Sequence, residues 1–214
     1  ITFVHTNDLH AGYGPSLQST SQFARIRAFY ESVLAQNPYT VFTDGGDAYE
    51  KGSVAELLSE GVATRQAVFA MEYDVRVIGN HDFAWSVDEL IEYTHDPHSI
   101  VLMSNQSYEG DHPLGLGSVE WAEVQVGCVR VGFFGMVSKP WNEQNQQYDG
   151  DFFPEFPSTY DYAGVAAGLI GQHGDDVDLV VMVSHLGLGT DEELAAAVPG
   201  IDVILGGHSH STLW

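Results

Sequence analysis

The sequence predicts an α/β domain with a mixed sheet system. Short β-branched or apolar runs alternate with amphipathic helical patterns, which is the order typical of an α/β fold. Two neighbouring runs, residues 119–126 and 129–137, flank Gly127 and Cys128 and have the form of an antiparallel hairpin. A chain of 214 residues, 44% of them hydrophobic, can bury one sizeable core. One domain with both parallel and antiparallel strand pairs is therefore expected.

The elements follow from these patterns in chain order. The clearest strands besides the hairpin are residues 2–6, 40–43, 75–78, 179–184 and 203–205. Capping boxes, in which a Ser or Thr is followed three residues later by Glu, mark three helix starts: Ser53 with Glu56, Ser86 with Glu89, and Thr190 with Glu193. Residues 139–162 contain three prolines and are predicted to form a long irregular loop.

The charge balance limits the partners of this chain. Seven Lys and Arg against thirty Asp and Glu give a net charge of -23, which argues against polymeric nucleic acid or an anionic membrane surface as partner. Such an acidic surface is tolerated best where salt screens it, although simple solubility explains it equally well. No apolar run is long enough to cross a bilayer. A small-molecule partner is favoured.

Cysteine and the chain ends carry less information. Cys128 is the sole cysteine, so no internal disulfide is possible, and its place between two valines predicts a buried small apolar residue. The chain opens directly on a strand-like run, so any export signal is expected to have been removed ahead of it. It ends four residues after His210, which suggests that the sequence continues.

Five loops that follow hydrophobic runs carry Asp, Asn and His. They are Asp8-Leu9-His10, Gly45-Gly46-Asp47, Gly79-Asn80-His81-Asp82, Ser184-His185, and Gly206-Gly207-His208-Ser209-His210. Carboxylate and imidazole ligands suit Mn, Fe, Co, Ni or Zn, and the absence of thiolates disfavours a structural zinc site. Side chains two positions apart point the same way if the backbone is extended, so each D-x-H or H-x-H pair is expected to converge on one centre.

These blocks, read as D-x-H, G-D, G-N-H-[DE], H and G-H-x-H, resemble in order the signature of the calcineurin-like metallophosphoesterases. More narrowly, residues 5–10, 45–47 and 206–210 resemble the amino-terminal catalytic domain of the 5'-nucleotidases. All five blocks in one order would arise by chance roughly once in a hundred cases or less. The resemblance implies a four-layer αββα sandwich of two mixed sheets flanked by helices, with residues 1–214 as the catalytic domain.

The resemblance also implies a pair of divalent metal ions, drawn from Mn, Zn, Fe, Co and Ni. One metal would be held by Asp8, His10, Asp47 and His210, and the other by Asp47, Asn80, His185 and His208. Two cations about 3.5–4 Å apart need a shared anion to offset their repulsion, which is the role expected of Asp47. Asn80 supplies a neutral oxygen ligand and, with His81, is expected to face the substrate.

His81 follows a predicted ligand directly and is the expected general acid, which stabilises the phosphoryl oxygens or protonates the leaving oxygen. Nucleotidases of this type usually pair that histidine with an aspartate three residues later, but this chain has Ala84 there. Either Asp82 or another carboxylate orients His81, or the dyad is weakened. Asp82 is therefore the second predicted catalytic residue.

The expected activity is hydrolysis of small phosphoesters, and a 5'-nucleotidase acting on nucleoside monophosphates in nucleotide catabolism is favoured. One alternative is a 2',3'-cyclic nucleotide phosphodiesterase or nucleotide-sugar hydrolase of the same family. A thiosulfate-ester hydrolase is a second alternative, which the G-N-H-D block disfavours. A third, of another class, is a metal-binding module without turnover. Family nucleotidases recognise the nucleoside through a separate carboxy-terminal domain, which these 214 residues lack. The resemblance implies a periplasmic or secreted location.

Other residues near these loops receive structural interpretations. Histidines outside the proposed ligand set are expected to be solvated or hydrogen-bonded, namely His5, His95, His98, His112 and His173. Aromatic residues near the loops are expected to pack under residues 139–162 rather than stack on a base: Phe83, Trp85, Trp141, Phe152, Phe153 and Phe156. None of the seven basic residues lies in the five loops, so metals must carry most phosphate recognition.

Overall fold

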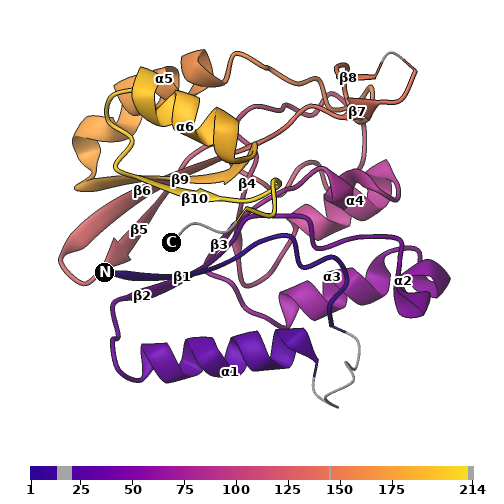
Figure 1. The fold of residues 1–214 in the computed structure, drawn as a ribbon, viewed down its shortest axis with the longest axis horizontal. Helices are drawn as coiled ribbons and strands as arrows, with labels where there is room; N and C mark the ends of the chain where they lie inside the picture. The colour runs from indigo at the N-terminus through magenta and orange to yellow at the C-terminus, as the bar shows by residue number, and fades with distance from the viewer. Residues whose placement is uncertain (14–20, 145, 212–214) are drawn as a thin grey trace.

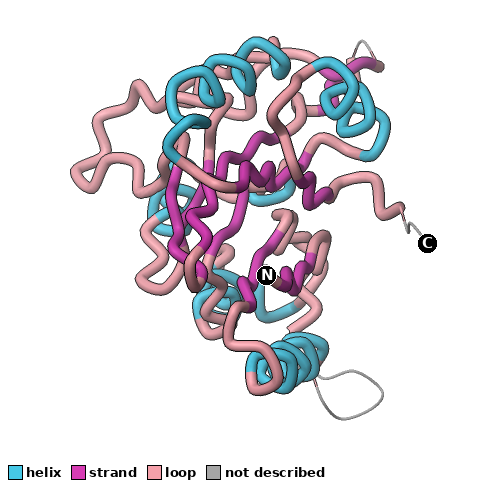
Figure 2. Tube along the Cα trace, turned by 90° about the vertical axis from the view of Figure 1, so that its left-hand side faces the viewer, coloured by secondary structure: helices cyan, strands magenta, loops and turns pink. Residues whose placement is uncertain are grey.

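Two four-stranded sheets pack face to face between two layers of helices (Figure 1). The computed structural model describes residues 1–13, 21–144 and 146–211. Viewed from the side, the strands lie in the middle of the molecule with helices above and below them (Figure 2). This is the four-layer arrangement that the family resemblance implies.

The first sheet is made of parallel strand pairs in the order β1-β2-β3-β4. Its strands are β1 (Thr2–Thr6), β2 (Thr40–Asp44), β3 (Val75–Val77) and β4 (Ile100–Leu102). Parallel neighbours need a crossover between them, which helices supply. These helices are α1 (Gln22–Leu34), α2 (Val54–Ser59), α3 (Val62–Phe69) and α4 (Val87–Thr94). In Figure 1, α1 lies below the sheet, and α2 and α4 lie to its right.

The second sheet has the order β10-β9-β6-β5 and contains the one antiparallel pair of the two large sheets, β5 with β6. Its strands are β5 (Ala122–Val126), β6 (Val129–Val137), β9 (Leu179–His185) and β10 (Val203–Gly206). Helices α5 (Tyr162–His173) and α6 (Leu188–Ala197) cover its outer face (Figure 1). Short 3-10 turns occupy His81–Phe83 and Gly174–Asp176, and a small hairpin pairs β7 (Trp141–Asn142) with β8 (Gln147–Tyr148).

The core follows from strand alternation, because successive side chains point to opposite faces of a sheet. Nine buried residues fill the space between the sheets: Val41, Val75, Val77 and Leu102 from the first, and Val126, Val131, Phe133, Val181 and Val183 from the second. A second cluster joins the first sheet to α1 and α4, and a third joins the second sheet to α5 and α6. Each such side chain stabilises the fold by roughly 1.5–3 kcal/mol.

Most predicted elements are confirmed within one residue of the expected bounds. The exception among the strands is β5, which begins at Ala122 rather than at residue 119. The capping boxes at Ser53 and Ser86 form as expected, because each serine oxygen accepts the backbone N–H three residues on, from Glu56 and Glu89 respectively, at 3.1 Å. Strand β4 and helices α1, α3 and α5 are not among the predicted elements.

Two predictions are wrong. Helix α6 begins at Leu188, so Thr190 lies inside its first turn instead of capping it. The reason is Gly187, whose φ of 86° turns the chain into the helix directly after the His185 loop. Cys128 is exposed rather than buried, because it sits in the two-residue turn between β5 and β6, outside both strands.

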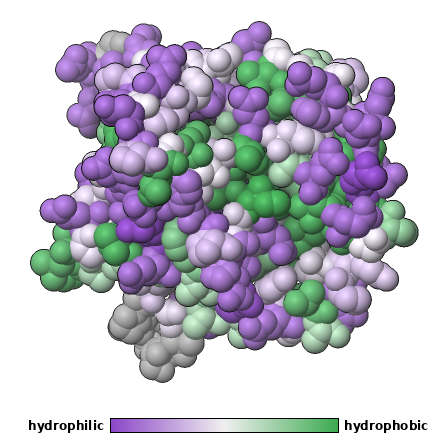
Figure 3. All heavy atoms as spheres, turned by 180° about the vertical axis from the view of Figure 1, so that it is seen from behind, coloured by the Kyte–Doolittle hydropathy of each residue, from purple (hydrophilic) through white to green (hydrophobic). Residues whose placement is uncertain are grey.

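The segment predicted as a long loop is described at residues 139–144 and 146–161; it carries the β7–β8 hairpin and is anchored by aromatic packing, while Tyr162 already begins α5. Phe156 is fully buried, and Phe83 stacks on Phe152 with ring centroids 4.1 Å apart. Trp141 is different, because 52% of it is exposed on the hairpin. Within the described ranges, no helix is long and apolar enough to span a membrane. Seen from behind, hydrophilic residues cover much of the surface and apolar ones gather toward its middle (Figure 3).

Candidate metal centre

The predicted ligands lie at the carboxyl ends of five strands, three from the first sheet and two from the second. Asp8 follows β1, Asp47 follows β2 and Asn80 follows β3, whereas His185 ends β9. His208 and His210 follow β10. Since β1, β2 and β3 run parallel, as do β9 and β10, these loops emerge at shared edges of the two facing sheets. The fold thus brings together residues that are up to 202 positions apart.

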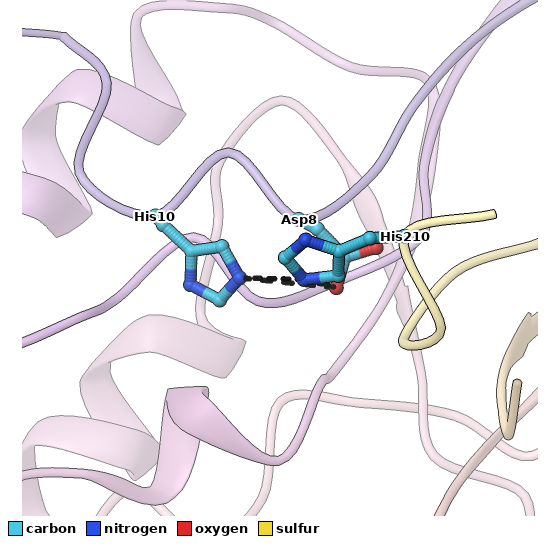
Figure 4. A group of neighbouring side chains, drawn as sticks. All are labelled: Asp8, His10 and His210. Carbon is cyan, nitrogen blue, oxygen red and sulfur yellow. Dashed lines mark hydrogen bonds and ion pairs between the residues drawn. The ribbon is translucent and has the colours of Figure 1, made fainter. Parts of the chain in front are cut away.

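One group of donors comes from the two ends of the chain. The side chains of Asp8, His10 and His210 point toward one another (Figure 4). His210 Nε2 lies 3.3 Å from Asp8 Oδ1 and 3.2 Å from His10 Nε2. Two imidazole nitrogens at this separation need a proton or a metal cation between them, because neutral lone pairs repel. The group therefore fits a cation.

A second group surrounds the fully buried ring of His185. Its Nε2 lies 3.1 Å from Asp47 Oδ2 and 3.1 Å from Asn80 Oδ1. His208 joins this group, with its ring centroid 5.0 Å from that of His185. The other ring nitrogen, Nδ1, is 2.5 Å from the carbonyl oxygen of Gly45. Donation of Nδ1–H to that carbonyl leaves Nε2 free as a ligand, which is how metal-binding histidines are usually oriented.

Asp47 lies between the groups. Its Oδ1 accepts the backbone N–H of His81 at 2.7 Å, while its Oδ2 faces His185. Asp47 also belongs to a third donor group, with His10 and His81. Only 2% of Asp47 is exposed, so its charge is directed at neighbours and not at solvent. The bridging of two metals by Asp47 stays a prediction, which this position supports.

The backbone of these loops is not extended. Five predicted ligands adopt positive φ, namely Asp8 at 53°, His10 at 42°, Asp47 at 61°, His208 at 77° and His210 at 50°. Residues other than glycine rarely occupy this left-handed region, and they do so mostly where the surrounding structure requires it. The expectation of extended pairs is therefore wrong. Asp8 and His10 converge through a turn, and His208 and His210 join different groups.

Two glycines let the β2 and β3 loops touch. Gly46 has a φ of 85°, and a Cβ placed on it would lie 2.5 Å from the backbone nitrogen of Gly79. A Cβ on Gly79 would in turn lie 2.2 Å from Asp47 Oδ1. Side chains at either position would push the loops apart and displace Asp47. The glycines in these two motifs are thus required by close packing.

The electrostatics of the second group are dominated by the buried pair of Asp47 and His185. Burial opposes charge on both Asp47 and His185, yet their hydrogen bond and mutual attraction raise the pKa of His185 to about 9 and hold the pKa of Asp47 below its usual value. Burial and the nearby charge of His185 lower the pKa of His208. A divalent cation would take the place of the proton that the pair otherwise shares.

Asp82 does not face the ring of His81. Its buried carboxylate accepts the backbone N–H groups of Gly79 at 2.8 Å, Ala48 at 2.9 Å and Asp47 at 3.2 Å. Burial and the charge of Asp47 raise the pKa of Asp82 to about 6. Asp82 thus ties the β2 loop to the β3 loop, and this geometry does not support the expected orienting or catalytic contact with His81.

His81 lies at the open side of the site, where 40% of its side chain is exposed. Its ring packs edge-on against that of His10, with centroids 4.8 Å apart. The carboxylate beside both rings belongs to Glu50, which sequence reasoning missed. Its position three residues after Asp47 in the same loop is the one available signal, and a glutamate in a loop is too common for that signal to be decisive.

The hydrogen-bonded role expected of His5 is confirmed. His5 lies 2.9 Å from Thr43 Oγ1 and 3.1 Å from the carbonyl oxygen of Gly206, so it links β1 to β2 and to β10 of the other sheet. Burial lowers the pKa of His5 to about 4. Asp44 caps the turn after β2, because it accepts the N–H of Gly46 at 3.2 Å. In the described part of the chain, the donor groups also leave out His95, His98, His112 and His173.

The whole architecture identifies the protein family. The sequence model of the calcineurin-like phosphoesterase family matches residues 1–212, so the chain belongs to that family. Family membership confirms the predicted fold and the predicted class of phosphoric ester hydrolase at the level of the family.

Several known proteins are similar over the full chain. An apyrase from Tabanus yao is 25% identical over 100% of this chain and 40% of its own length, and a snake venom 5'-nucleotidase from Crotalus adamanteus is 24% identical over 100% and 37%. The structure of a 5'-nucleotidase precursor from Thermus thermophilus superposes with a TM-score of 0.84 and 28% identity, covering 100% of this chain and 42% of that one. The chain thus spans about 40% of the length of the relatives it matches.

Proposed function

We propose that this chain is the catalytic domain of a phosphoester hydrolase that uses two divalent metal ions and acts on nucleoside 5'-monophosphates or related nucleotides. The observation that carries the proposal is the position of Asp47, whose two oxygens face different neighbours in adjoining donor groups. One carboxylate between two sets of donors is what a pair of cations requires.

The assignment of ligands follows the donor groups. Asp8, His10 and His210 form one set, Asn80, His185 and His208 form the other, and Asp47 is shared. When bound, two cations at these sets supply Lewis acidity toward phosphoryl oxygens and lower the pKa of a coordinated water. The chain itself supplies no thiolate to either set, which favours Mn, Fe, Co, Ni or Zn in an exchangeable catalytic site.

The protein side chains then bind and orient the substrate. His81 is exposed at the open side of the site and is proposed to hydrogen-bond a phosphoryl oxygen or give a proton to the departing oxygen. Asn80 directs its amide oxygen at His185 and leaves its amide nitrogen available to the phosphate. No covalent attachment of substrate to the chain is required.

Charge and composition support a small substrate. None of the seven Lys and Arg residues lies in the five loops, so phosphate recognition falls to the metals. A net charge of -23 repels a polyanion, whereas one phosphoester can be neutralised locally. The names of the relatives, an apyrase and 5'-nucleotidases, support nucleotides as the substrate class, and the venom origin of one supports an extracytoplasmic setting.

The test combines metal analysis with a substrate panel. Purified protein is stripped with a chelator, reloaded with Mn²⁺ or Zn²⁺, and analysed for bound metal per chain. Hydrolysis is then measured with 4-nitrophenyl phosphate, a nucleoside 5'-monophosphate, a 2',3'-cyclic nucleotide and a nucleotide sugar. Two metals per chain with metal-dependent release of phosphate from the monophosphate support the proposal.

Each other outcome of this test points to a different function. Preferred cleavage of the cyclic nucleotide or the nucleotide sugar transfers the assignment to those substrates. Two bound metals without turnover of any ester indicate a binding module, and fewer than two metals contradict the dinuclear site. A matched control is Glu193→Gln, which removes an exposed carboxylate on α6, outside the donor groups of the described chain. This variant is expected to bind metal and turn over like the parent.

A further inference from the structure

We propose that Glu50 is a positioning residue that orients two imidazoles at once, His10 within the first donor set and His81 beside it. The part that concerns His81 rests on the proposed function, whereas the part that concerns His10 rests only on metal binding. Ala84 cannot supply a carboxylate, and Asp82 uses its carboxylate on backbone N–H groups. Glu50 supplies the carboxylate beside the ring of His81 that neither of these residues supplies.

The geometry joins one oxygen to two rings. Glu50 Oε2 lies 2.6 Å from His10 Nδ1 and 3.5 Å from His81 Nδ1. The two rings meet at an interplanar angle of 78°, and the Nδ1 atoms of both face the same Glu50 oxygen. Among the described residues, Glu50 is the carboxylate within 4.0 Å of the His81 ring nitrogens. A single carboxylate thus lies within ion-pair distance of both rings.

For His10, this contact determines which nitrogen is free. A strong acceptor at Nδ1 keeps the proton on that atom, so the lone pair of Nε2 points toward the other donors. His10 Nε2 lies 3.2 Å from His210 Nε2 and 3.9 Å from Asp8 Oδ1. The other acceptor near Nδ1 is the carbonyl oxygen of Tyr49, at the longer distance of 3.4 Å. Glu50 therefore dominates the orientation of this ring.

For His81, the same oxygen limits rotation of an exposed ring. The backbone of His81 is fixed by Asp47, which accepts its N–H at 2.7 Å, but 40% of the side chain faces solvent. A carboxylate at Nδ1 reduces the freedom of the ring and leaves Nε2 as the nitrogen that a substrate can meet. Because Glu50 also contacts His10, the position of His81 is coupled to the metal-binding loop.

A buried polar network holds Glu50 in place. The backbone N–H groups of Glu50 and Lys51 donate to Glu56 Oε1 at 3.2 and 2.8 Å. Glu56 is fully buried and also accepts hydrogen bonds from Thr64 Oγ1 at 2.7 Å and Trp85 Nε1 at 3.1 Å. The Glu50 side chain itself is 41% exposed, so its substitution leaves the core intact.

The first measurement is metal binding, which requires no turnover. Metal-free wild-type protein, Glu50→Gln, Glu50→Ala and the control Glu193→Gln are titrated with Mn²⁺ by calorimetry. Loss of a carboxylate that orients a ligand histidine typically weakens binding or activity 10–100-fold. We expect both Glu50 variants to lose affinity about 10–100-fold at one of two sites, with the other site and the control unchanged.

The second measurement concerns His81. Long-range ¹H–¹⁵N spectra of ¹⁵N-histidine-labelled, metal-free protein report which ring nitrogen carries the proton, and a His81→Gln sample assigns its signal. Wild-type His81 is expected to be protonated at Nδ1, and the Glu50→Ala signal is expected to shift toward a mixture of tautomers. With reloaded enzyme, kcat for the nucleoside monophosphate should fall more than kcat for 4-nitrophenyl phosphate, whose leaving group needs little assistance, while KM changes little.

The outcomes separate this inference from the proposed function. Wild-type Mn²⁺ affinity in both Glu50 variants, or an unchanged His81 tautomer in Glu50→Ala, overturns the shared role of Glu50. A wild-type enzyme that hydrolyses no phosphoester defeats the proposed function, but calorimetry and the ring spectra still decide the inference. Weakened binding at one site together with a tautomer shift supports it in either case.

Discussion

Replacing Asp47 by Asn tests the shared carboxylate directly. Asp47 and His185 are 2% and 0% exposed, and Asp47 Oδ2 lies 3.1 Å from His185 Nε2. At pH 7 the imidazole is protonated in the metal-free protein, because the pKa of His185 is raised to about 9. Removing one partner of a buried ion pair costs about 3–5 kcal/mol. For a chain of this size, that loss lowers Tm by roughly 6–20 °C.

The same substitution should remove the response to metal. A ligand at a hundred times its Kd stabilises the folded state by about 2.7 kcal/mol, so saturating Mn²⁺ should raise the wild-type Tm by roughly 5–10 °C. Asp47→Asn is expected to lose this increase and its phosphatase activity. Thermal scans with and without Mn²⁺, followed by a 4-nitrophenyl phosphate assay, measure both. A variant that still gains stability from Mn²⁺ and turns over at the parent rate would refute the bridging role.

Two further outcomes are expected, one from pH and one from a buried ion pair. Burial lowers the pKa of His5 from 6.5 to about 4, so between these pH values the unfolded chain binds more protons than the folded one. The contribution of neutral His5 to the free energy of unfolding is therefore complete above pH 6.5. It falls by about 3 kcal/mol as the pH drops to about 4. Urea titrations at several pH values should show that this part of the pH dependence is missing in His5→Asn. If the free energy of unfolding changes equally with pH in both proteins, the role of His5 is contradicted. Arg76 and Asp96 are both fully buried with Nε and Oδ2 3.1 Å apart, so Asp96→Asn should cost about 3–5 kcal/mol. In the same titrations, the double variant Arg76→Met with Asp96→Leu should recover part of the stability lost in Asp96→Asn. If it recovers none, lost packing and not an unpaired charge causes the loss.

Local sequence patterns were sufficient for the strands and for two of the helix caps. Runs such as Leu179–His185 are rich in β-branched residues, so their structure follows from local preference and burial. Thr190 failed because a glycine three residues earlier already begins the helix, and Cys128 failed because apolar neighbours do not distinguish a strand from its turn. Where a turn intervenes, alternation of side chains no longer indicates burial.

The site was predictable in composition but not in geometry. Every predicted ligand lies in or beside a donor group because the five motifs constrain which residue types occur in each loop. The left-handed backbone at Asp8 and His208, by contrast, is imposed by contacts with other loops. For example, the backbone N–H of His208 donates to Asp8, 200 positions away. Glu50 was missed for the same reason, since its role depends on two rings that only the folded chain brings to it.

The divided origin of the donor sets has a consequence for folding cooperativity. Asp8 and His10 extend from one sheet, whereas His210 follows the edge strand of the other, so the proposed cation held by all three would fasten the layers together at their rim. Such a cross-link forms only after both layers are complete, because its components lie at opposite ends of the sequence. Stripping the metal should therefore loosen the edge strand β10 before it affects the interior, and amide exchange in Val203–Gly206 would report that loosening first.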